Sequence, residues 1–192
     1  MGRKLYLADP HFGHENVISF DHRPFASAEE MDLIMIENWQ KKARKDDEVY
    51  IVGDFCYRNG KDPEWYLEQL PGKKFLVIRN HDQKMLKRPG IMNYFEDVSK
   101  MMHVTDNGRQ ICLCHFPLCE WNGYYRDSYH IYGHIHNRLS DTCMIMRRRK
   151  NAYNAAASIN GYTPCTLDEI IANNIRFEKE HPLSWMDLPP VR

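Results

Sequence analysis

The chain has 192 residues, of which 43% are hydrophobic and 12% aromatic, and its 26 basic side chains balance 26 acidic ones. This composition is typical of one folded domain and excludes a disordered or collagenous chain. The absence of net charge argues against a general polyanion-binding surface, although it leaves room for a local basic patch. No apolar stretch reaches the roughly 20 residues needed to span a bilayer, and the first residues lack a signal-peptide core, so we expect a cytoplasmic protein without a membrane partner.

Strands and helices are predicted to alternate in the first half of the chain. Ser27 and Glu30 have capping-box spacing and predict a helix through about Arg44. A second helix is predicted to start at Asp62-Pro63 and to end near residue 70, before Pro71-Gly72. Apolar runs predict strands at residues 4–8, 48–52, 74–78, 110–114 and 130–132.

The second half begins with a predicted hairpin, because Asp106-Asn107-Gly108 separates two strand-like runs. Residues 142–146 and 152–159 are interpreted as a further strand pair. Thr166 and Glu169 again have capping-box spacing and predict a last helix to about residue 176. We therefore expect a single domain over residues 1–176 and an irregular tail over residues 177–192 packed on it.

Five short polar motifs follow the five apolar runs. Their chemistry-bearing residues are Asp9 and His11, Asp54, Asn80 with His81 and Asp82, His115, and His134 with His136. Because open α/β folds bind ligands at the carboxyl ends of their strands, these side chains are expected to meet on one rim. Together they indicate a metal site.

Seven of these residues offer oxygen or nitrogen donors to metals. Seven donors are too many for one tetrahedral zinc ion and suit two ions that share a carboxylate. Such a pair of ions lowers the pKa of a bound water enough to supply hydroxide near neutral pH. This arrangement is typical of hydrolytic phosphoryl transfer.

The cysteines suggest a competing metal hypothesis, because Cys112, Cys114, His115 and Cys119 lie close together in the sequence. Structural zinc sites, however, usually have two to four residues between paired cysteines. In a strand, Cys112 and Cys114 would point to one face and Leu113 to the other. We interpret these thiols as buried and reduced, with no disulfide framework.

The order D-x-H, G-D, N-H-D, H, G-H-x-H resembles that of the calcineurin-like metallophosphoesterase superfamily, and the resemblance covers residues 4–171. The longer strings around Asp9, Arg23 and Asp54 are similar to its small bacterial and phage-type members. The resemblance implies an α/β fold with two mixed β-sheets packed as a sandwich between flanking helices.

The resemblance also implies roles for the polar residues. One ion would be held by Asp9, His11 and His136 and the other by Asn80, His115 and His134, with Asp54 bridging them. His81 would approach the substrate as a catalytic residue, and Asp82 would orient its ring. Mn²⁺ is the first choice of ion, and Fe, Zn, Co or Ni are the alternatives that the mixed ligands allow.

The chain departs from the family pattern at Arg79, which stands where a glycine usually precedes the N-H-D triplet. Arg79 is a candidate phosphate contact, and the alternative is a solvated or ion-paired side chain. His14 and Arg23 are further candidate substrate contacts. Their alternatives are a hydrogen-bonded loop histidine and a salt bridge near the start of a helix.

The function expected from these features is a dinuclear metal-dependent phosphoesterase that cleaves a phosphomonoester or phosphodiester by attack of a metal-bridging hydroxide. The expected partner is a small phosphorylated substrate such as a nucleotide, and the protein is expected to be a monomer or a homodimer. Two alternatives stay open. One is a metal-dependent nuclease acting on nucleic acid, and the other is a non-catalytic metal-binding scaffold of the same fold.

Overall fold

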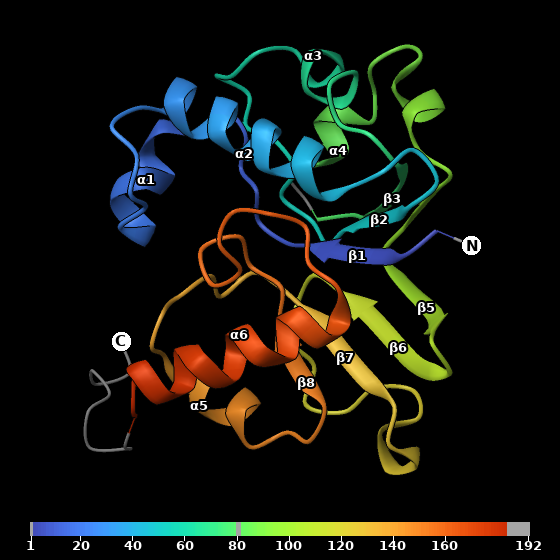
Figure 1. Ribbon diagram of the computed structural model, residues 1–192, viewed down its shortest axis with the longest axis vertical. Coiled ribbons are helices and arrows are strands. Elements are labelled where there is room, and N and C mark those ends of the chain that lie inside the picture. Colours follow the sequence, from blue (N-terminus) through green and yellow to red (C-terminus); the bar gives the residue numbers. More distant parts are fainter. Residues whose placement is uncertain (1, 80–81, 184–192) are drawn as a thin grey trace.

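Two four-stranded sheets lie face to face in the computed structural model, which describes residues 2–79 and 82–183 (Figure 1). The strands of the first sheet are all parallel and follow the order β1 (Lys4–Leu7), β2 (Glu48–Ile51), β3 (Lys73–Val77) and β4 (Asp97–Ser99). The second sheet is mixed and follows the order β5 (Met101–Asp106), β6 (Arg109–Cys114), β7 (Tyr129–Tyr132) and β8 (Ala152–Asn154). The expected α/β sandwich of two sheets is confirmed, but only the second sheet is mixed, because the first is parallel throughout.

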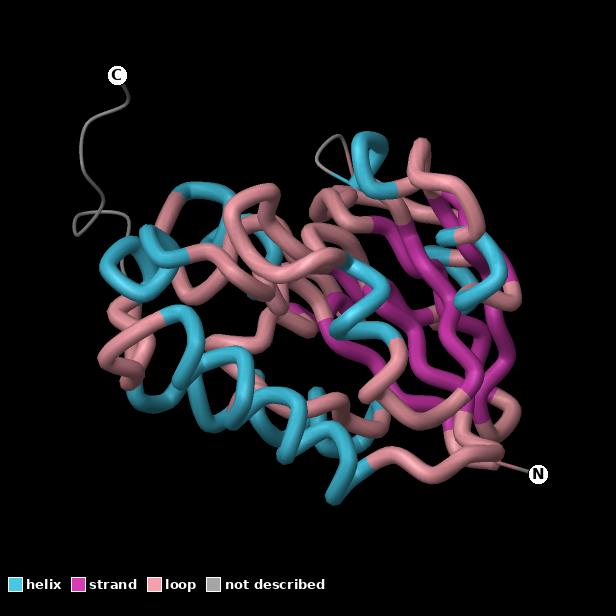
Figure 2. The backbone as a smooth tube through the Cα atoms, turned by 90° about the horizontal axis from the view of Figure 1, so that it is seen from above, coloured by secondary structure: helices cyan, strands magenta, loops and turns pink. Residues whose placement is uncertain are grey.

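Helices lie outside the group of strands, as Figure 2 shows from above. They are α1 (Glu15–Asp21), α2 (Ala28–Lys42), α3 (Pro63–Leu67), α4 (Asp82–Met85), α5 (Asp141–Arg147) and α6 (Leu167–Glu180), with 3-10 turns at Ile91–Tyr94 and Tyr124–Arg126. Among the described residues, none of these helices has the length and apolar character that crossing a membrane requires.

Side chains of the first strands point alternately into two hydrophobic cores, one between the sheet and the helices and one between the two sheets. In β1, Leu5 and Leu7 face the helices and join a cluster with Met35 and Trp39 of α2. Tyr6 points the other way, into the cluster between the sheets. Because successive side chains of a strand point to opposite faces, one strand serves both layers.

The core between the sheets combines aromatic rings of the first sheet with aliphatic side chains of the second. The Tyr50 ring stacks between Tyr6, at 5.4 Å, and Phe75, at 4.6 Å. Ile111 and Ile131 of β6 and β7 pack in the same cluster. The chain after β8 then runs beside β1, with a bridge between Ala8 and Ala156 and another between Tyr6 and Cys165.

Local capping signals predicted the two long helices. The Ser27 hydroxyl accepts from the Glu30 amide at 3.1 Å to begin α2. Thr166 and Glu169 form a complete capping box at the start of α6. The hairpin at Asn107-Gly108 is also confirmed, with φ of 48° and 81° at these residues as a tight hairpin turn requires.

The predicted strand at residues 142–146 is wrong, because α5 occupies this stretch. The Ser140 hydroxyl accepts from the Cys143 amide at 3.4 Å and caps the helix. A short apolar run has no hydrophobic periodicity that distinguishes a helix from a strand. The Ser140 cap therefore favours the helix at this position. The paired strand ends at Asn154, α3 ends at Leu67, and α6 continues to Glu180 into the segment expected to be irregular.

The cysteines are all free thiols, as expected. Cys112 and Cys114 are buried on the face of β6 opposite Leu113, which packs between the sheets. Cys119 is exposed. The described residues contain no cysteine among the grouped candidate metal ligands, so the competing cysteine site has no support in the structure.

Candidate metal centre

The candidate ligands lie where strands end. Asp9 follows β1, Asp54 follows β2, His115 follows β6 directly, and His134 and His136 follow β7. Because β1 and β2 are parallel to each other, as β6 and β7 are, each pair ends at one edge of its sheet. Asn80 and His81 lie outside the described residues, so their predicted roles stay predictions.

The backbone at these positions is unusual. Among the described non-glycine residues, ten have a positive φ, and five of these ten are candidate ligands: Asp9, His11, Asp54, His134 and His136, at 54°, 55°, 52°, 70° and 50°. The left-handed region is open to Asp and His more often than to most residues, but it still costs free energy. Clusters of such residues mark functional sites.

Four of these side chains form one compact group. Ligand atoms of Asp9, His11, Asp54 and His136 all lie within 4.8 Å of one another. The Nε2 atoms of His11 and His136 are 3.2 Å apart, and His136 Nε2 lies 3.5 Å from Asp9 Oδ1. Two carboxylates and two imidazoles in this arrangement match the donor set of a divalent transition-metal ion.

A second group extends from Asp54. His115 Nε2 lies 3.8 Å from Asp54 Oδ2, the same oxygen that lies 3.5 Å from His11 Nε2. The His134 ring is 5.4 Å from the His115 ring, centroid to centroid. One carboxylate oxygen therefore lies between two sets of histidines, and the bridging role that the resemblance implies for Asp54 stays a prediction.

Several atoms of the site are buried without a hydrogen-bond partner among the described residues. They include Asp9 Oδ1, Asp54 Oδ1 and His115 Nε2. Burying such a polar atom unpaired costs about 1–3 kcal/mol, and more for a charged group. A bound cation would satisfy these atoms together, so the residues fit a metal ion.

The ring orientations of two histidines are fixed from behind. His115 Nδ1 lies 2.9 Å from the Val52 carbonyl oxygen, which can only accept, so Nδ1 carries the proton and Nε2 has a free lone pair. His136 Nδ1 lies 2.6 Å from Asp21 Oδ2 and in the same way leaves Nε2 free for a metal. Partners of this kind are typical of metal-binding histidines.

Asp21 is a site residue that the sequence did not reveal. It is fully buried in the structure and is held by Arg23, whose Nε and Nη2 lie 3.2 and 3.1 Å from Asp21 Oδ2. Asp21 and His136 are 115 residues apart, so no local spacing connects them. In the sequence, the only sign of this role is the polar triplet Asp21-His22-Arg23, which is too common a pattern to identify a site residue.

Arg23 is placed differently from the expected substrate contact. Its side chain is 0% exposed and donates to the carbonyl oxygens of Pro10 and Asp9, each at 2.9 Å. With Asp21 also bound, most of its guanidinium donors are used inside the protein. Arg23 therefore holds the left-handed loop at Asp9 in place. Of its two expected roles, the structure shows the salt bridge and not the substrate contact.

Arg79 points into the centre. Its Nη1 lies 2.6 Å from Asp54 Oδ2, and its side chain is 23% exposed. The ion-paired alternative is thus the one that the structure contains, with a partner that is itself a candidate ligand.

Asp82 holds the loops around Asp54. Its Oδ1 accepts from the Phe55 amide at 3.0 Å, and its Oδ2 accepts from the amides of Asp54 at 3.2 Å and Arg79 at 2.8 Å. The side chain is buried. These contacts identify a structural role for Asp82, while its predicted action on His81 involves a residue outside the described part of the chain.

Two aromatic side chains border the centre. His14 accepts from the Val17 amide through Nδ1 at 3.2 Å, and its ring lies 4.0 Å from the Tyr57 ring and 5.4 Å from the His11 ring. Phe116, which the sequence did not single out, is 42% exposed and packs 4.7 Å from the His134 ring. His14 thus begins a helix beside the metal ligands, and its substrate contact stays a prediction.

Burial controls the ionisation of the site. It raises the pKa of Asp9 to about 6, and burial together with the neighbouring charge of Asp9 raises the pKa of Asp54 to about 7, against the opposing effect of Arg79. Burial lowers the pKa of His115 to about 3. The imidazole therefore stays neutral, which is its metal-binding form.

Two glycines allow the close approach of the motifs. A Cβ at Gly53, where φ is +81°, would lie 2.2 Å from His115 Nδ1. A Cβ at Gly133 would lie 2.5 Å from Asp9 Oδ2. The glycines of the G-D and G-H-x-H motifs are thus required because ligands from other strands occupy the space beside them.

An asparagine cluster fixes the backbone at His136. Asn154 donates from Nδ2 to the His136 carbonyl at 2.7 Å and accepts from the Ala156 amide at 2.9 Å. Asn174 of α6 accepts from the Asn154 amide at 2.9 Å. The chain after β8 thereby supports the last motif.

Comparison with known proteins places the chain among relatives of similar length. No protein-family model matches it. Uncharacterized protein MJ1445 of Methanocaldococcus jannaschii is 30% identical over 172 residues, which cover 88% of this chain and 90% of that protein. Gene 66 protein of Mycobacterium phage D29 is 25% identical, over 78% of this chain and 86% of that protein.

One solved structure is similar to this chain over nearly its whole length. The protein of unknown function AQ665 from Aquifex aeolicus has a TM-score of 0.68 at 26% identity, covering 90% of this chain and 99% of that one. The motif order resembles that of the calcineurin-like metallophosphoesterase superfamily, and its described members meet at the strand ends. The chain belongs to the family of MJ1445.

Proposed function

We propose that this protein is a metal-dependent hydrolase of phosphate esters. The observation that carries the proposal is the group of buried, unpaired ligand atoms on Asp9, Asp54 and His115 at the ends of the strands. A divalent ion bound there would lower the pKa of water and offset the charge of a phosphoryl group. Two ions, with Mn²⁺ as first choice, suit the two histidine groups on either side of Asp54 Oδ2.

Other residues of the chain would orient the metal ligands or bind the substrate. Asp21 and the Val52 carbonyl orient the imidazoles of His136 and His115. Arg79 presents a guanidinium beside Asp54, where it can bind a phosphoryl oxygen. For His81 we keep the role of the group that contacts the substrate and protonates the leaving oxygen, which is typically worth about 10²–10⁴ in rate.

The test is a substrate screen with added Mn²⁺. Native protein is compared with Asp54→Asn and with Asp127→Asn, a matched control because Asp127 is an exposed carboxylate paired with Lys150. Phosphomonoesters, phosphodiesters, cyclic nucleotides and oligonucleotides form the panel. We expect hydrolysis of a small ester by native protein and Asp127→Asn, and near abolition in Asp54→Asn.

The alternatives give different results in the same screen. Cleavage of oligonucleotides in preference to small esters would identify a nuclease. Stoichiometric metal binding without turnover of any compound would identify the non-catalytic scaffold. Full activity of Asp54→Asn would contradict the proposed centre itself.

A further inference from the structure

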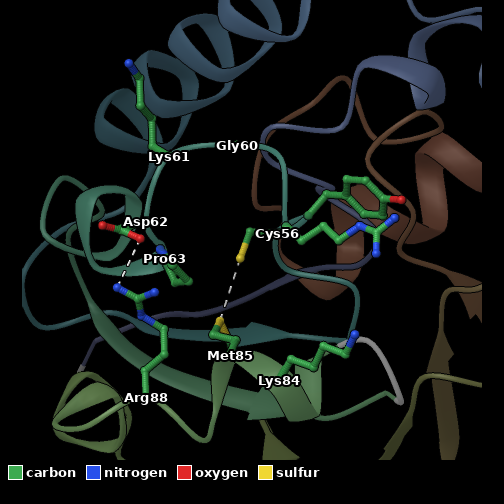
Figure 3. A pocket seen from close by; sticks show the side chains of 10 residues that line it. Cys56, Gly60, Lys61, Asp62, Pro63, Lys84, Met85 and Arg88 are labelled. Atoms are coloured by element: carbon green, nitrogen blue, oxygen red, sulfur yellow. Dashed lines mark hydrogen bonds and ion pairs between the residues drawn. The ribbon is translucent and has the colours of Figure 1, made fainter.

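A pocket of about 470 Å³ lies between the loop after β2 and helix α4. One wall is formed by residues 56–63 and the other by Lys84, Met85 and Arg88. Cys56 and Met85 face each other across it, and the side chains of Lys61 and Lys84 extend away from this pair at the edge of the pocket (Figure 3). This volume falls within the range of sites that bind small molecules, about 300–1,000 Å³.

The pocket is strongly basic although the chain as a whole is neutral. Arg58, Lys61, Lys84 and Arg88 line it, against Asp62 as its one acidic lining residue. Arg88 is neutralised by Asp62 at 3.0 Å and Glu64 at 2.8 Å. Within residues 2–79 and 82–183, no acidic side chain forms an ion pair with the other three cations, although Arg58 lies over the Tyr57 ring at 5.8 Å and Lys61 over the Trp65 ring at 6.0 Å. Their charge is therefore not neutralised by a carboxylate.

The pocket is joined to the metal centre on the side of α4. Asp82, the first residue of α4, accepts from the backbone amides of Asp54 and Phe55 and so fastens the helix to the loop that carries Asp54. One helical turn further, Met85 Sδ lies 3.8 Å from Cys56 Sγ. Cys56 is two residues from Asp54, which limits the distance between their Cα atoms to about 7.6 Å.

The pocket also reaches the centre through stacked rings. Tyr57 lines the pocket, and its ring lies 4.0 Å from that of His14. The His14 ring in turn lies 5.4 Å from that of His11, a candidate metal ligand. The Tyr57 and His14 rings thus connect the pocket wall to the metal centre, and a compound that binds at both places would lie along them.

We infer that this pocket binds a second phosphate group of the substrate, one that is not hydrolysed. The inference rests on the proposed function and makes the substrate class a small molecule that carries at least two phosphates. The cations of Arg58 and Lys84 supply the recognition, because charge-assisted hydrogen bonds to phosphate are stronger than neutral ones. The sulfur atoms of Cys56 and Met85 provide an apolar floor for the organic part.

A matched pair of ligands tests the inference by binding alone. Adenosine 5′-monophosphate and adenosine 3′,5′-bisphosphate are titrated calorimetrically into the Mn²⁺-loaded protein. We expect the bisphosphate to bind at least about ten-fold more tightly, the scale of one charge-assisted contact. The advantage should shrink as salt is added, because the three cations are partly open to solvent.

Variants identify the residues responsible. Arg58→Gln and Lys84→Gln should each reduce the preference for the bisphosphate, and the double variant should abolish it, while affinity for the monophosphate changes little. Lys87→Gln is the control, because Lys87 is exposed on the same segment and does not line the pocket. Equal affinity for the two nucleotides in native protein, or a preference that survives in the double variant, would overturn the inference.

The outcome is separable from that of the proposed function. Hydrolysis of the phosphomonoesters and phosphodiesters of the screening panel is measured on the same samples. Turnover without a preference for the bisphosphate refutes the pocket and leaves the proposed function standing. A preference without any turnover refutes the proposed function and retains the pocket as a phosphate-binding site.

Discussion

His136 and Asp21 form a buried pair in which the imidazole Nδ1 lies 2.6 Å from the carboxylate Oδ2. Burial by itself raises the pKa of Asp21, but the hydrogen bond from His136 and the neighbouring Arg23 guanidinium lower it below its usual value. The carboxylate therefore stays ionised and holds the ring with Nε2 toward Asp9. This pair connects the end of α1 with the last motif.

Asp21→Asn is expected to weaken Mn²⁺ binding by about 10–100-fold, the usual effect of losing a residue that orients a metal ligand. The amide oxygen of Asn can still accept from His136 and Arg23, but it lacks the negative charge that strengthens both contacts. Calorimetric titration with Mn²⁺ measures the loss, and thermal unfolding checks that the variant folds. Asp127→Asn is the control, and unchanged affinity in Asp21→Asn would show that the pair does not position His136.

Gly53→Ala is expected to abolish tight metal binding, because the new Cβ would lie 2.2 Å from His115 Nδ1. Gly108→Ala is a matched control, since Gly108 also has a φ of +81° but has no atom within 4 Å of an added Cβ. Both variants should lose about 1 kcal/mol or more of stability through backbone strain. Loss of metal binding in both would assign the effect to strain instead of to the clash.

Arg79→Met is expected to raise the affinity for Mn²⁺ by about ten-fold or more. The guanidinium lies 2.6 Å from Asp54 Oδ2, so it competes with a cation for that oxygen and repels it. The same variant should bind inorganic phosphate more weakly once loaded with metal, because a charge-assisted contact is lost. Both affinities are measured by titration, with Arg126→Met as an exposed control. Weaker Mn²⁺ binding in the variant would mean that Arg79 supports the centre.

The pH dependence of stability should contain a contribution from Asp32. Burial raises its pKa from 3.8 to about 6, although the Gly13 amide at 2.9 Å and the Tyr66 hydroxyl at 2.8 Å both donate to it and oppose the shift. The folded state therefore favours the protonated acid, so this stability is fully present below pH 3.8 and is lost as pH rises through about 6.

Asp32→Asn imitates the protonated acid and should remove this dependence. From pH 4 to pH 7 the variant should gain about 2 kcal/mol relative to native protein, since one pKa unit corresponds to about 1.4 kcal/mol. Urea unfolding at several pH values measures the difference. Glu29→Gln, an exposed change on the same helix, should show no such trend. A constant difference across this range would contradict the assignment to Asp32.

The sequence predicted the strands that end at the site to within one residue, and the fold class followed from the family resemblance. It also led us to expect Asp9, His11, Asp54, His115, His134 and His136 at one rim, and the structure places these side chains near one another. Strand ends are local signals, so their positions could be predicted, while the roles of these residues as metal ligands stay predictions. The pairing of Asp21 with His136 and the burial of Arg23 depend on contacts between distant segments, which no spacing shows.

Two further properties were hidden from the sequence for physical reasons. The helical state of residues 141–147 depends on a cap at Ser140 and on packing against β8, not on a period. The left-handed backbone at Asp9 and His134 arises because loops turn sharply after neighbouring strands. Because Asp and His tolerate the left-handed region, the residue types at these positions do not predict a positive φ.

The left-handed ligands give the protein a conflict between durability and activity. At roughly 1–2 kcal/mol each, before the tolerance of Asp and His is counted, five such residues place roughly 5–10 kcal/mol against a net stability of about 5–15 kcal/mol. If metal binding were not required, replacing any of the five with glycine would relieve this backbone strain and raise the free energy of unfolding. In the proposed metal centre, the geometry of the ligands would thus be kept at the expense of thermal resistance.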